Sequence, residues 1–224
     1  MRAVCPAHRP EGVFHAAARK HLPMLEQYPE EGWKTNVLGT KNVVELAVEY
    51  GVKNLVNIST DKAAEPTTVL GRSKRVAERI VAHYSQQVAE RGWRYVSVRF
   101  GNVLGSRGSV LWTFTSQIEH GGPITITHPD VERFLMPIPE ASALVLQAGA
   151  IGRAGEVLVL DMGQPVKIMD VAKRMIQMSG KQISIEITGM RPGEKLTEVL
   201  HFEGEKDERP FHPLISHTSV PQVD

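Results

Sequence analysis

The sequence has one cysteine, no long apolar run and almost no net charge, and each absence excludes a class of protein. Cys5 alone cannot form an intramolecular disulfide, so burial of apolar side chains has to stabilise the fold. No uncharged apolar run approaches the roughly 18 residues that a membrane-spanning helix needs. The net charge of +1, from 26 Lys and Arg against 25 Asp and Glu, provides no field for binding nucleic acid or anionic lipid.

The amino terminus also lacks the apolar core of a signal peptide, because Pro6, His8 and Arg9 interrupt it. Together with the lone cysteine, this favours the reducing cytoplasm as the protein's location. What is present is a chain of 224 residues, 42% hydrophobic and 23% charged, which is the balance of an ordinary globular protein. Its length suffices for one large or two small cores.

Predicted strands and helices alternate along the first half of the chain. Short apolar runs at 13–15, 55–58 and 95–98 are typical of buried strands, and helical patterns follow at 29–50, 71–91 and 110–119. Such an alternation requires a parallel, doubly wound sheet. Asn36 and Gly39 are poor helix formers inside the first of these helices, which indicates a packing or backbone-bonding role for them.

Polar residues cluster where the strand at 55–58 ends. Thr60, Asp61 and Lys62 follow it directly, and open α/β sheets bind ligands beyond the carboxyl ends of their strands. A solvated turn is the simpler interpretation of an isolated Thr-Asp-Lys, but its place after a buried strand favours function. Lys74 falls on the apolar stripe of the helix at 71–91, so it either extends to the surface or pairs with a buried group.

Five segments, in order and spacing, resemble the extended short-chain dehydrogenase/reductase family of polysaccharide biosynthesis. They are residues 13–21, 34–40, 58–63, 99–106 and 191–195. Within that family the sequence is most similar to the UDP-N-acetylglucosamine 4,6-dehydratases. The resemblance implies an incomplete, Rossmann-like doubly wound sheet whose first cofactor half is missing from this chain, with a smaller carboxyl-terminal substrate-binding region.

The resemblance implies three parts of the chain. Residues 1–120 would form a partial NAD-binding domain with the catalytic loop, residues 121–202 a substrate-binding α/β region from which one strand returns to the sheet, and residues 203–224 a surface extension rich in charge and proline. Extended members of the family usually dimerise through two long helices. The corresponding helices here, at 29–50 and 71–91, are therefore the expected homo-oligomer interface.

The resemblance also implies an internal redox cycle on a sugar nucleotide. NAD takes a hydride from carbon 4, water leaves across carbons 5 and 6, and the hydride returns to carbon 6. Asp61 would protonate the departing hydroxyl, Lys62 would remove the carbon 5 proton, and Thr60 would bond the substrate. Lys74 would bond the nicotinamide ribose. A lysine can act as a base only if its pKa is depressed, for example by burial.

Further binding residues follow from the same resemblance, which implies no metal site. Ala16 and Ala17, in a loop of small residues after the first strand, would lie against NAD together with Lys74. The nucleotide sugar would be bound by four residues: Asn102, Arg133, Arg191 and Glu194. For the two arginines, the alternative is that they are ordinary surface residues without a ligand. Arginine suits phosphate because it can donate two parallel hydrogen bonds.

Two positions depart from the family pattern. Leu70 stands where the superfamily has its catalytic tyrosine, so deprotonation of the carbon 4 hydroxyl would fall to Asp61, Lys62 or a water. The pyrophosphate-binding Gly-x-x-Gly-x-x-Gly loop is also absent, since the first glycine of the chain is Gly12. The glycines at 101, 105 and 108 do not replace it, because their spacing differs and no acidic residue ends a following strand to bind ribose.

Three functions therefore remain open at the level of sequence. A nucleotide-sugar 4,6-dehydratase is the first, and a catalytically silent protein that binds nucleotide sugar or associates with a relative is the second, favoured by the absent cofactor loop. The third is a nucleotide-sugar 4-epimerase. Epimerisation needs no elimination acid and usually relies on the tyrosine that Leu70 replaces, so Thr60-Asp61-Lys62 argues against it.

Overall fold

The computed structural model describes residues 2–106 and 108–221, which fold into two compact units. Unit 1 comprises Met1–Phe100, Ala143–Asp161 and Val199–Asp224, and unit 2 comprises Gly101–Ser142 and Met162–Glu198. The chain thus leaves unit 1 after the third predicted strand and returns to it twice. This division differs from the predicted boundaries at 120 and 202, because residues 101–119 pack with later segments rather than with the sheet.

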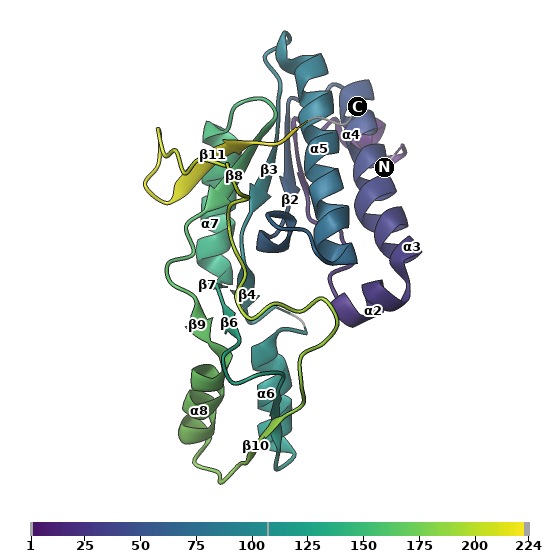
Figure 1. The fold of residues 1–224 in the computed structure, drawn as a ribbon. Helices are drawn as coiled ribbons and strands as arrows, with labels where there is room; N and C mark the ends of the chain where they lie inside the picture. Colours follow the sequence, from purple (N-terminus) through teal and green to yellow (C-terminus); the bar gives the residue numbers. More distant parts are fainter. Residues whose placement is uncertain (1, 107, 222–224) are drawn as a thin grey trace. The chain divides into compact units, whose positions relative to one another are not determined.

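Unit 1 is built on a five-stranded sheet with the order β1-β2-β3-β8-β11 (Figure 1). The first four strands run parallel and the last is antiparallel to its neighbour: β1 (Gly12–His15), β2 (Asn54–Ile58), β3 (Arg94–Arg99), β8 (Glu156–Leu160) and β11 (Ile215–Ser219). The predicted parallel α/β sheet is confirmed, and β8 is the strand from within residues 121–202 that was predicted to return to it. The predicted surface extension is wrong in part, because β11 lies in it and Ile215 to Thr218 are buried.

Helices cover both faces of this sheet, as a doubly wound fold requires. On one face, α4 (Gly39–Glu49) and α5 (Val69–Ala89) bury a core that includes Val44, Leu55 and Tyr95. The other face carries α7 (Ile138–Ile151). A Cβ placed on Gly149 of that helix would lie 2.8 Å from Val56 Cγ2, so a glycine permits the close approach of α7 to β2.

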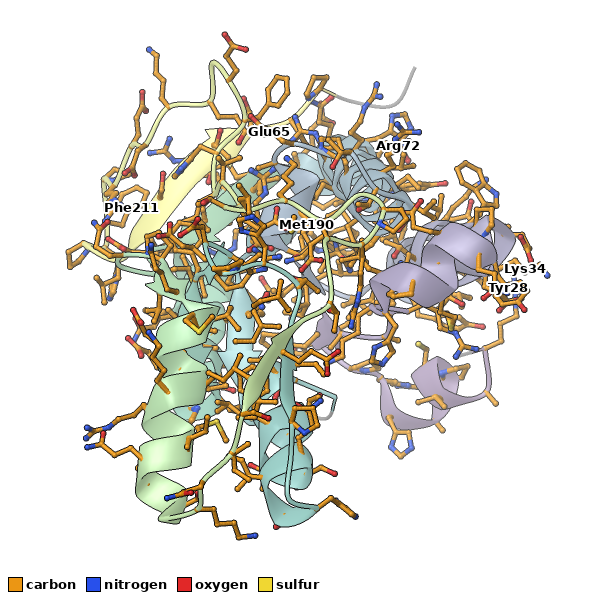
Figure 2. The ribbon with its side chains drawn as sticks, turned by 60° about the horizontal axis from the view of Figure 1, so that its bottom comes forward. Tyr28, Lys34, Glu65, Arg72, Met190 and Phe211 are labelled. Carbon is orange, nitrogen blue, oxygen red and sulfur yellow. The ribbon has the colours of Figure 1, made fainter. Side chains whose placement is uncertain are left out.

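The helical segment predicted at 29–50 is interrupted by a stretch of π-helix. α3 (Pro29–Gly32) leads into π-helical residues Trp33–Leu38 and then into α4. Tyr28 and Lys34 lie at the outer side of this region (Figure 2), and Trp33 and Leu38 are also exposed. Two short helices, α1 (Val4–His8) and α2 (Leu22–Gln27), precede it.

Among the residues that the structure describes, unit 2 contains three two-stranded sheets and two whole helices. The strand pairs are β4 (Asn102–Leu104) with β7 (Leu135–Pro137), β5 (Ile124–Ile126) with β10 (Ile185–Ile187), and β6 (Glu132–Arg133) with β9 (Val166–Lys167). α6 (Val110–Glu119) and α8 (Ile168–Ser179) share an apolar core with β5 that includes Phe114, Ile124 and Ile168. No helix in the described part of the chain is long and apolar enough to cross a membrane.

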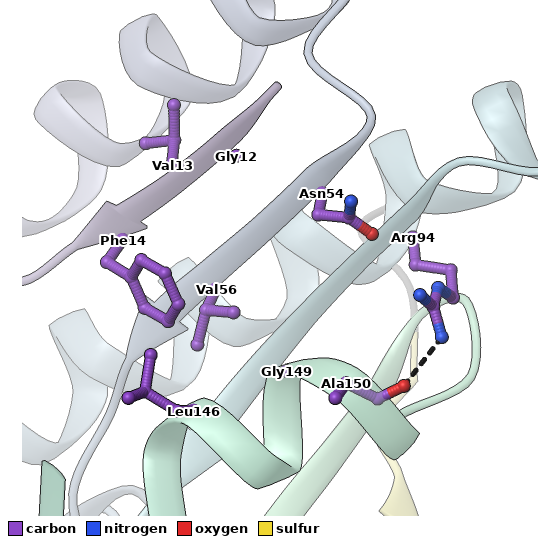
Figure 3. Close-up of a pocket in the computed structure, with 9 residues that line it drawn as sticks. All are labelled: Gly12, Val13, Phe14, Asn54, Val56, Arg94, Leu146, Gly149 and Ala150. Atoms are coloured by element: carbon purple, nitrogen blue, oxygen red, sulfur yellow. Dashed lines mark hydrogen bonds between the residues drawn. The ribbon is translucent and has the colours of Figure 1, made fainter. Parts of the chain in front are cut away.

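The outer edge of β1 is apolar and accessible. Within the described residues β1 pairs only with β2, and Phe14 and Leu146 beside it are 52% and 59% exposed. A pocket of about 330 Å³ lies between these strands and α7, and Figure 3 shows the side chains that line it. Its far end is closed by Arg94, whose Nη1 donates to the carbonyl oxygen of Ala150 at 2.7 Å.

This edge predicts self-association of the isolated chain. An accessible strand edge with apolar side chains recruits other strands, so wild-type protein should form larger species as its concentration rises. Phe14→Lys should shift the distribution towards monomer, whereas Met178→Lys, at a 77% exposed position in unit 2, should not. Sedimentation velocity across a range of concentrations measures this. A wild-type chain that remains a monodisperse monomer would contradict the prediction.

Candidate active site

The loop that carries the predicted acid and base is fixed to the sheet by its backbone. Ser59 N donates to Val98 O at 2.7 Å, and Asp61 N donates to Phe100 O at 3.0 Å. Asp61 then begins a 3₁₀ turn, Asp61–Ala63, whose last residue is fully buried. The carboxyl end of β2 therefore delivers a rigid turn rather than a flexible loop.

Asp61 and Lys62 form a largely buried ion pair at the start of this turn. Lys62 Nζ lies 2.9 Å from Asp61 Oδ1, with side-chain exposures of 14% and 0%. The same Oδ1 accepts hydrogen bonds from Thr60 Oγ1 at 2.8 Å and from Lys62 N at 2.9 Å. Asp61 Oδ2 is buried and has no hydrogen-bond partner. One carboxylate oxygen is thus fully engaged while the other is left for a ligand or a proton.

Lys74 is buried rather than extended to the surface. Its side chain lies on the sheet side of α5, the residue is 5% exposed, and Nζ donates to the carbonyl oxygen of Ile58. Burial lowers the pKa of Lys74 to about 8, against the charge of Glu78, which acts in the opposite direction. Leu70, one helical turn earlier, is also buried and supplies no hydroxyl.

Hydrogen bonds link buried polar side chains from β1 to α5. His15 Nε2 lies 3.0 Å from Thr40 Oγ1, which donates to the carbonyl oxygen of Asn36 at 2.7 Å. Because that hydroxyl has one proton, His15 donates through Nε2. Asn36 Nδ2 donates to Ser73 Oγ at 2.9 Å. Burial, aided by the charge of Lys74, lowers the pKa of His15 to about 4, so its imidazole is neutral at pH 7.

Asn36 also holds the loop that follows β1. Its Oδ1 accepts from Arg19 N at 2.8 Å and its Nδ2 donates to Arg19 O at 3.0 Å. The predicted backbone-bonding role is confirmed for Asn36, which lies within the π-helical stretch, where such irregularities often mark functional sites. A Cβ on Gly39 would meet Lys34 O at an ordinary 3.5 Å, so space does not require glycine there.

Gly71 is a site residue that the sequence did not reveal. A Cβ at this position would lie 2.4 Å from the carbonyl oxygen of Lys62 and 3.1 Å from Pro66 Cα. The first turn of α5 therefore lies directly against the Asp61–Ala63 turn, and any side chain at position 71 would displace one of them. A glycine in the first turn of a predicted helix was the available signal. Ala16 and Ala17, predicted to contact NAD, lie exposed after β1.

Unit 2 brings together three of the four predicted sugar-nucleotide residues. Arg133 Nη2 lies 3.2 Å from Glu194 Oε1, and Glu194 Oε2 accepts from Arg191 N at 3.1 Å. Arg133 Nη1 donates to three backbone carbonyl oxygens, those of Glu132, Lys195 and Leu196. Arg133 thus fixes the loop at 191–196, in which Arg191 is exposed. The fourth, Asn102, begins β4 and donates its N–H to Phe134 O at 3.0 Å.

The low pKa of His15 predicts loss of stability in acid. The unfolded state has an ordinary pKa of 6.5 and the folded state about 4, so between these values the unfolded chain binds more protons. The free energy of unfolding should therefore fall as the pH falls from 6.5 to 4. By pH 4 the protonation of His15 should have lowered the free energy of unfolding by roughly 1–3 kcal/mol, where the lower value allows for solvent screening.

Urea unfolding of wild type and His15→Gln at several pH values measures this contribution. Glutamine keeps a donor for Thr40 but does not titrate, so the difference between the two proteins in free energy of unfolding, followed against pH, isolates the effect of His15. If this difference stays constant from pH 7 to pH 4, the imidazole is not held neutral in the folded chain.

Comparison with known proteins identifies the family. The family model described as "Polysaccharide biosynthesis protein" matches residues 1–219. The capsular polysaccharide biosynthesis protein CapD of Staphylococcus aureus is 55% identical over 195 residues, which are 86% of this chain and 32% of CapD. The UDP-glucose 4-epimerase of Rickettsia canadensis is 39% identical over 193 residues, 86% of this chain and 56% of the epimerase. The chain thus spans between about a third and just over half of these relatives.

Solved structures agree with this assignment. Pen from Bacillus thuringiensis has a TM-score of 0.87 and 36% identity, covering 94% of this chain and 66% of Pen. DesIV, a dTDP-glucose 4,6-dehydratase from Streptomyces venezuelae solved with NAD bound, has a TM-score of 0.77 over 86% of this chain and 65% of DesIV. Its 20% identity shows the fold alone. The chain therefore belongs to the family described as "Polysaccharide biosynthesis protein".

Proposed function

We propose that this chain carries the acid–base residues of an NAD-dependent dehydratase that converts a UDP-N-acetylhexosamine to its 4-keto-6-deoxy sugar. The observation that supports this most directly is the Asp61–Lys62 pair at the end of β2. An elimination needs an acid and a base that reach different atoms of one ring. Adjacent residues of a rigid turn meet that need, and Asp61 Oδ2 is buried without a partner.

Asp61 and Lys62 together hold one proton, which is what the proposed elimination requires. As an ion pair, Lys62 is protonated and Asp61 is not; moving one proton over the 2.9 Å between Nζ and Oδ1 produces a neutral amine and a carboxylic acid. The amine then removes the carbon 5 proton and the acid protonates the leaving hydroxyl. The products of these two steps are again the ion pair, so the turn is reset without a proton from solvent. Displacement of water by bound sugar favours the neutral form.

Three residues of unit 1 fit NAD, which when bound supplies acceptance and return of a hydride. Lys74, with a pKa of about 8, remains mostly protonated at pH 7 and can donate to a ribose hydroxyl. Ala16 and Ala17 are exposed at the carboxyl end of β1 and leave space for close approach of a ligand. Thr60 Oγ1 donates to Asp61 Oδ1 beside the substrate position. Since the pair already holds its one proton and position 70 has no tyrosine, the carbon 4 hydroxyl proton would pass to water, and a proton from water would be added at carbon 5 when the hydride returns.

Unit 2 has the groups that a nucleotide diphosphate needs. Arg191 is exposed on a loop that Arg133 and Glu194 hold, and a guanidinium can donate to two phosphate oxygens at once. At the start of α6, Ser109 Oγ is buried without a partner. Together with the N–H groups that any helix presents at its start, it suits an anion. We assign Asn102 to the same ligand.

Two alternatives remain. A 4-epimerase is favoured by the 39% identity to the Rickettsia canadensis enzyme. The Asp61–Lys62 pair argues against it, because epimerisation involves no loss of water. A silent binding module is the second alternative, and turnover by a complete form would exclude it. We further propose that α4 and α5 associate two copies, with exposed Trp33 and Leu38 contributing apolar surface.

Substitution of the pair tests the main proposal. In a form of the protein that carries a complete NAD-binding half, Asp61→Asn and Lys62→Ala should each lower the rate of product formation by roughly 10²–10⁴. The affinity for nucleotide sugar should change little. Lys53→Ala, which removes a lysine paired on the surface with Glu11, is the matched control. Mass spectrometry distinguishes loss of water from epimerisation, and near-wild-type turnover by either variant would refute the assignment.

Calorimetry tests the sugar-nucleotide residues in the chain as it stands. UDP-N-acetylglucosamine should bind more tightly than NAD, because Asn102 and Arg191 are present and the glycine-rich phosphate loop is not. Arg191→Ala should weaken UDP-sugar binding by about tenfold, equivalent to ~1.4 kcal/mol. Arg174→Ala, on α8, should leave it unchanged. NAD binding tighter than UDP-sugar binding would contradict the assignment.

A further inference from the structure

We propose that Glu78 and Glu205 are positioning residues for the catalytic turn. Through Arg99 and Ser59 they hold the end of β2 from which Asp61 and Lys62 project. The inference rests on the proposed function for the roles of Asp61 and Lys62. It extends that function to the carboxyl-terminal segment, which contributes Glu205.

A buried cluster of four charges connects these residues. Arg99 is fully buried in β3, and its Nη2 donates to Glu78 Oε2 at 2.9 Å while its Nη1 donates to Glu205 Oε2 at 2.7 Å. Arg75 Nη1 closes the cluster with a bond of 2.9 Å to Glu205 Oε1. Two cations therefore face two carboxylates, and the buried cluster has no net charge.

The pKa shifts agree with mutual stabilisation inside the cluster. Burial tends to raise the pKa of Glu205, but the hydrogen bond and charge of Arg99 outweigh it and lower this pKa. The pKa of Arg99 is raised, because both carboxylates outweigh its burial. Buried ion pairs are costly to desolvate, and well-packed apolar residues would often stabilise a fold equally well. Stability alone therefore gives no reason for four charges at this place.

Ser59 connects the cluster to the catalytic turn. Its Oγ donates to Glu78 Oε1 at 2.5 Å, while its N–H donates to Val98 O. Ile58 is the register partner of Val98, so Ser59 and Arg99 are the next residues on neighbouring strands. Both the main chain and the side chain of Ser59 are thus fixed immediately before Thr60.

Glu78 also acts on Lys74. The two residues are one helical turn apart on α5, and the charge of Glu78 opposes the effect of burial on the pKa of Lys74. The charge of Lys74 in turn adds to the effect of burial in lowering the pKa of His15 on β1. A single carboxylate therefore holds the catalytic turn through Ser59 and opposes the lowering of the Lys74 pKa by burial.

The carboxyl-terminal segment completes the cluster. Arg99 Nη1 donates to the carbonyl oxygen of Leu200 at 3.0 Å, and Phe202 N donates to Glu205 Oε2 at 2.8 Å. The guanidinium of Arg75 lies 5.4 Å from the centre of the Phe202 ring. These contacts fix Glu205 as it enters the cluster, so a segment expected at the surface becomes part of the support for the site.

Three substitutions and one control test the proposal. Ser59→Ala and Glu205→Gln should lower kcat by about tenfold or more with little change in KM, because small displacements of reacting groups are costly. Glu78→Gln should do the same and also lower the pKa of Lys74 below about 8. Asp207→Asn removes a carboxylate from the same segment, paired with Arg209 outside the cluster, and should change neither quantity.

The measurements separate positioning from general stability. Turnover is measured in a form that carries a complete NAD-binding half, and the pKa of Lys74 by NMR titration of labelled lysine in the chain itself, with Lys74→Met for assignment. Ser59→Ala is the least disruptive variant and should retain the thermal midpoint. It should leave the pKa of Lys74 unchanged, because Glu78 keeps its charge.

Two results would overturn the inference. If Ser59→Ala and Glu205→Gln retain kcat while Asp61→Asn loses it, the cluster does not position the turn and the proposed function stands. If Glu78→Gln leaves the pKa of Lys74 unchanged, the link to the lysine is wrong. Full turnover by Asp61→Asn would instead refute the proposed function, and the titration of Lys74 would still decide the role of Glu78.

Discussion

The backbone bonds between the end of β2 and β3 are the constraint on which the site depends. Ser59 and Asp61 continue the parallel ladder for one bond each beyond the strand, to Val98 O and Phe100 O. The ladder thus determines where the 3₁₀ turn begins. Ion pairing of Asp61 with Lys62 then follows from local geometry, because neighbouring residues of a fixed turn cannot separate far.

α5 serves both the core and the site, and its sequence divides accordingly. Near its start, Gly71, Lys74 and Glu78 contact the backbone of Lys62, the backbone of Ile58 and the side chain of Ser59, respectively. Further along, Val81 and Val88 pack into the apolar core with Tyr95. Buried polar groups need partners, and a carbonyl oxygen, a hydroxyl and an arginine provide them here. The apolar face by which the sequence predicts this helix therefore also includes the two charged residues near the site, Lys74 and Glu78.

Regular, local features were predictable from the sequence, and features that depend on distant pairing were not. Apolar runs located β1, β2 and β3, and the helix at 110–119 was predicted with the bounds of α6. β11 was missed because its pairing with β8 depends on a distant segment. The bonding of Glu205 to Arg99 is equally non-local. The π-helical stretch was missed because hydrogen bonds shifted by one residue over a short stretch leave no distinct signal in the sequence.

The leucine at position 70 is consistent with the way protons are held at this site. In the proposed elimination, the neutral amine of Lys62 and the carboxylic acid of Asp61 act without a group from α5. A hydroxyl on α5 would then be needed only for the oxidation at carbon 4, where water would take the hydroxyl proton instead. On this view the catalytic turn contains the chemistry that distinguishes dehydration from epimerisation. The remainder of α5 packs against the Asp61–Ala63 turn through Gly71, and its Glu78 opposes the lowering of the Lys74 pKa by burial.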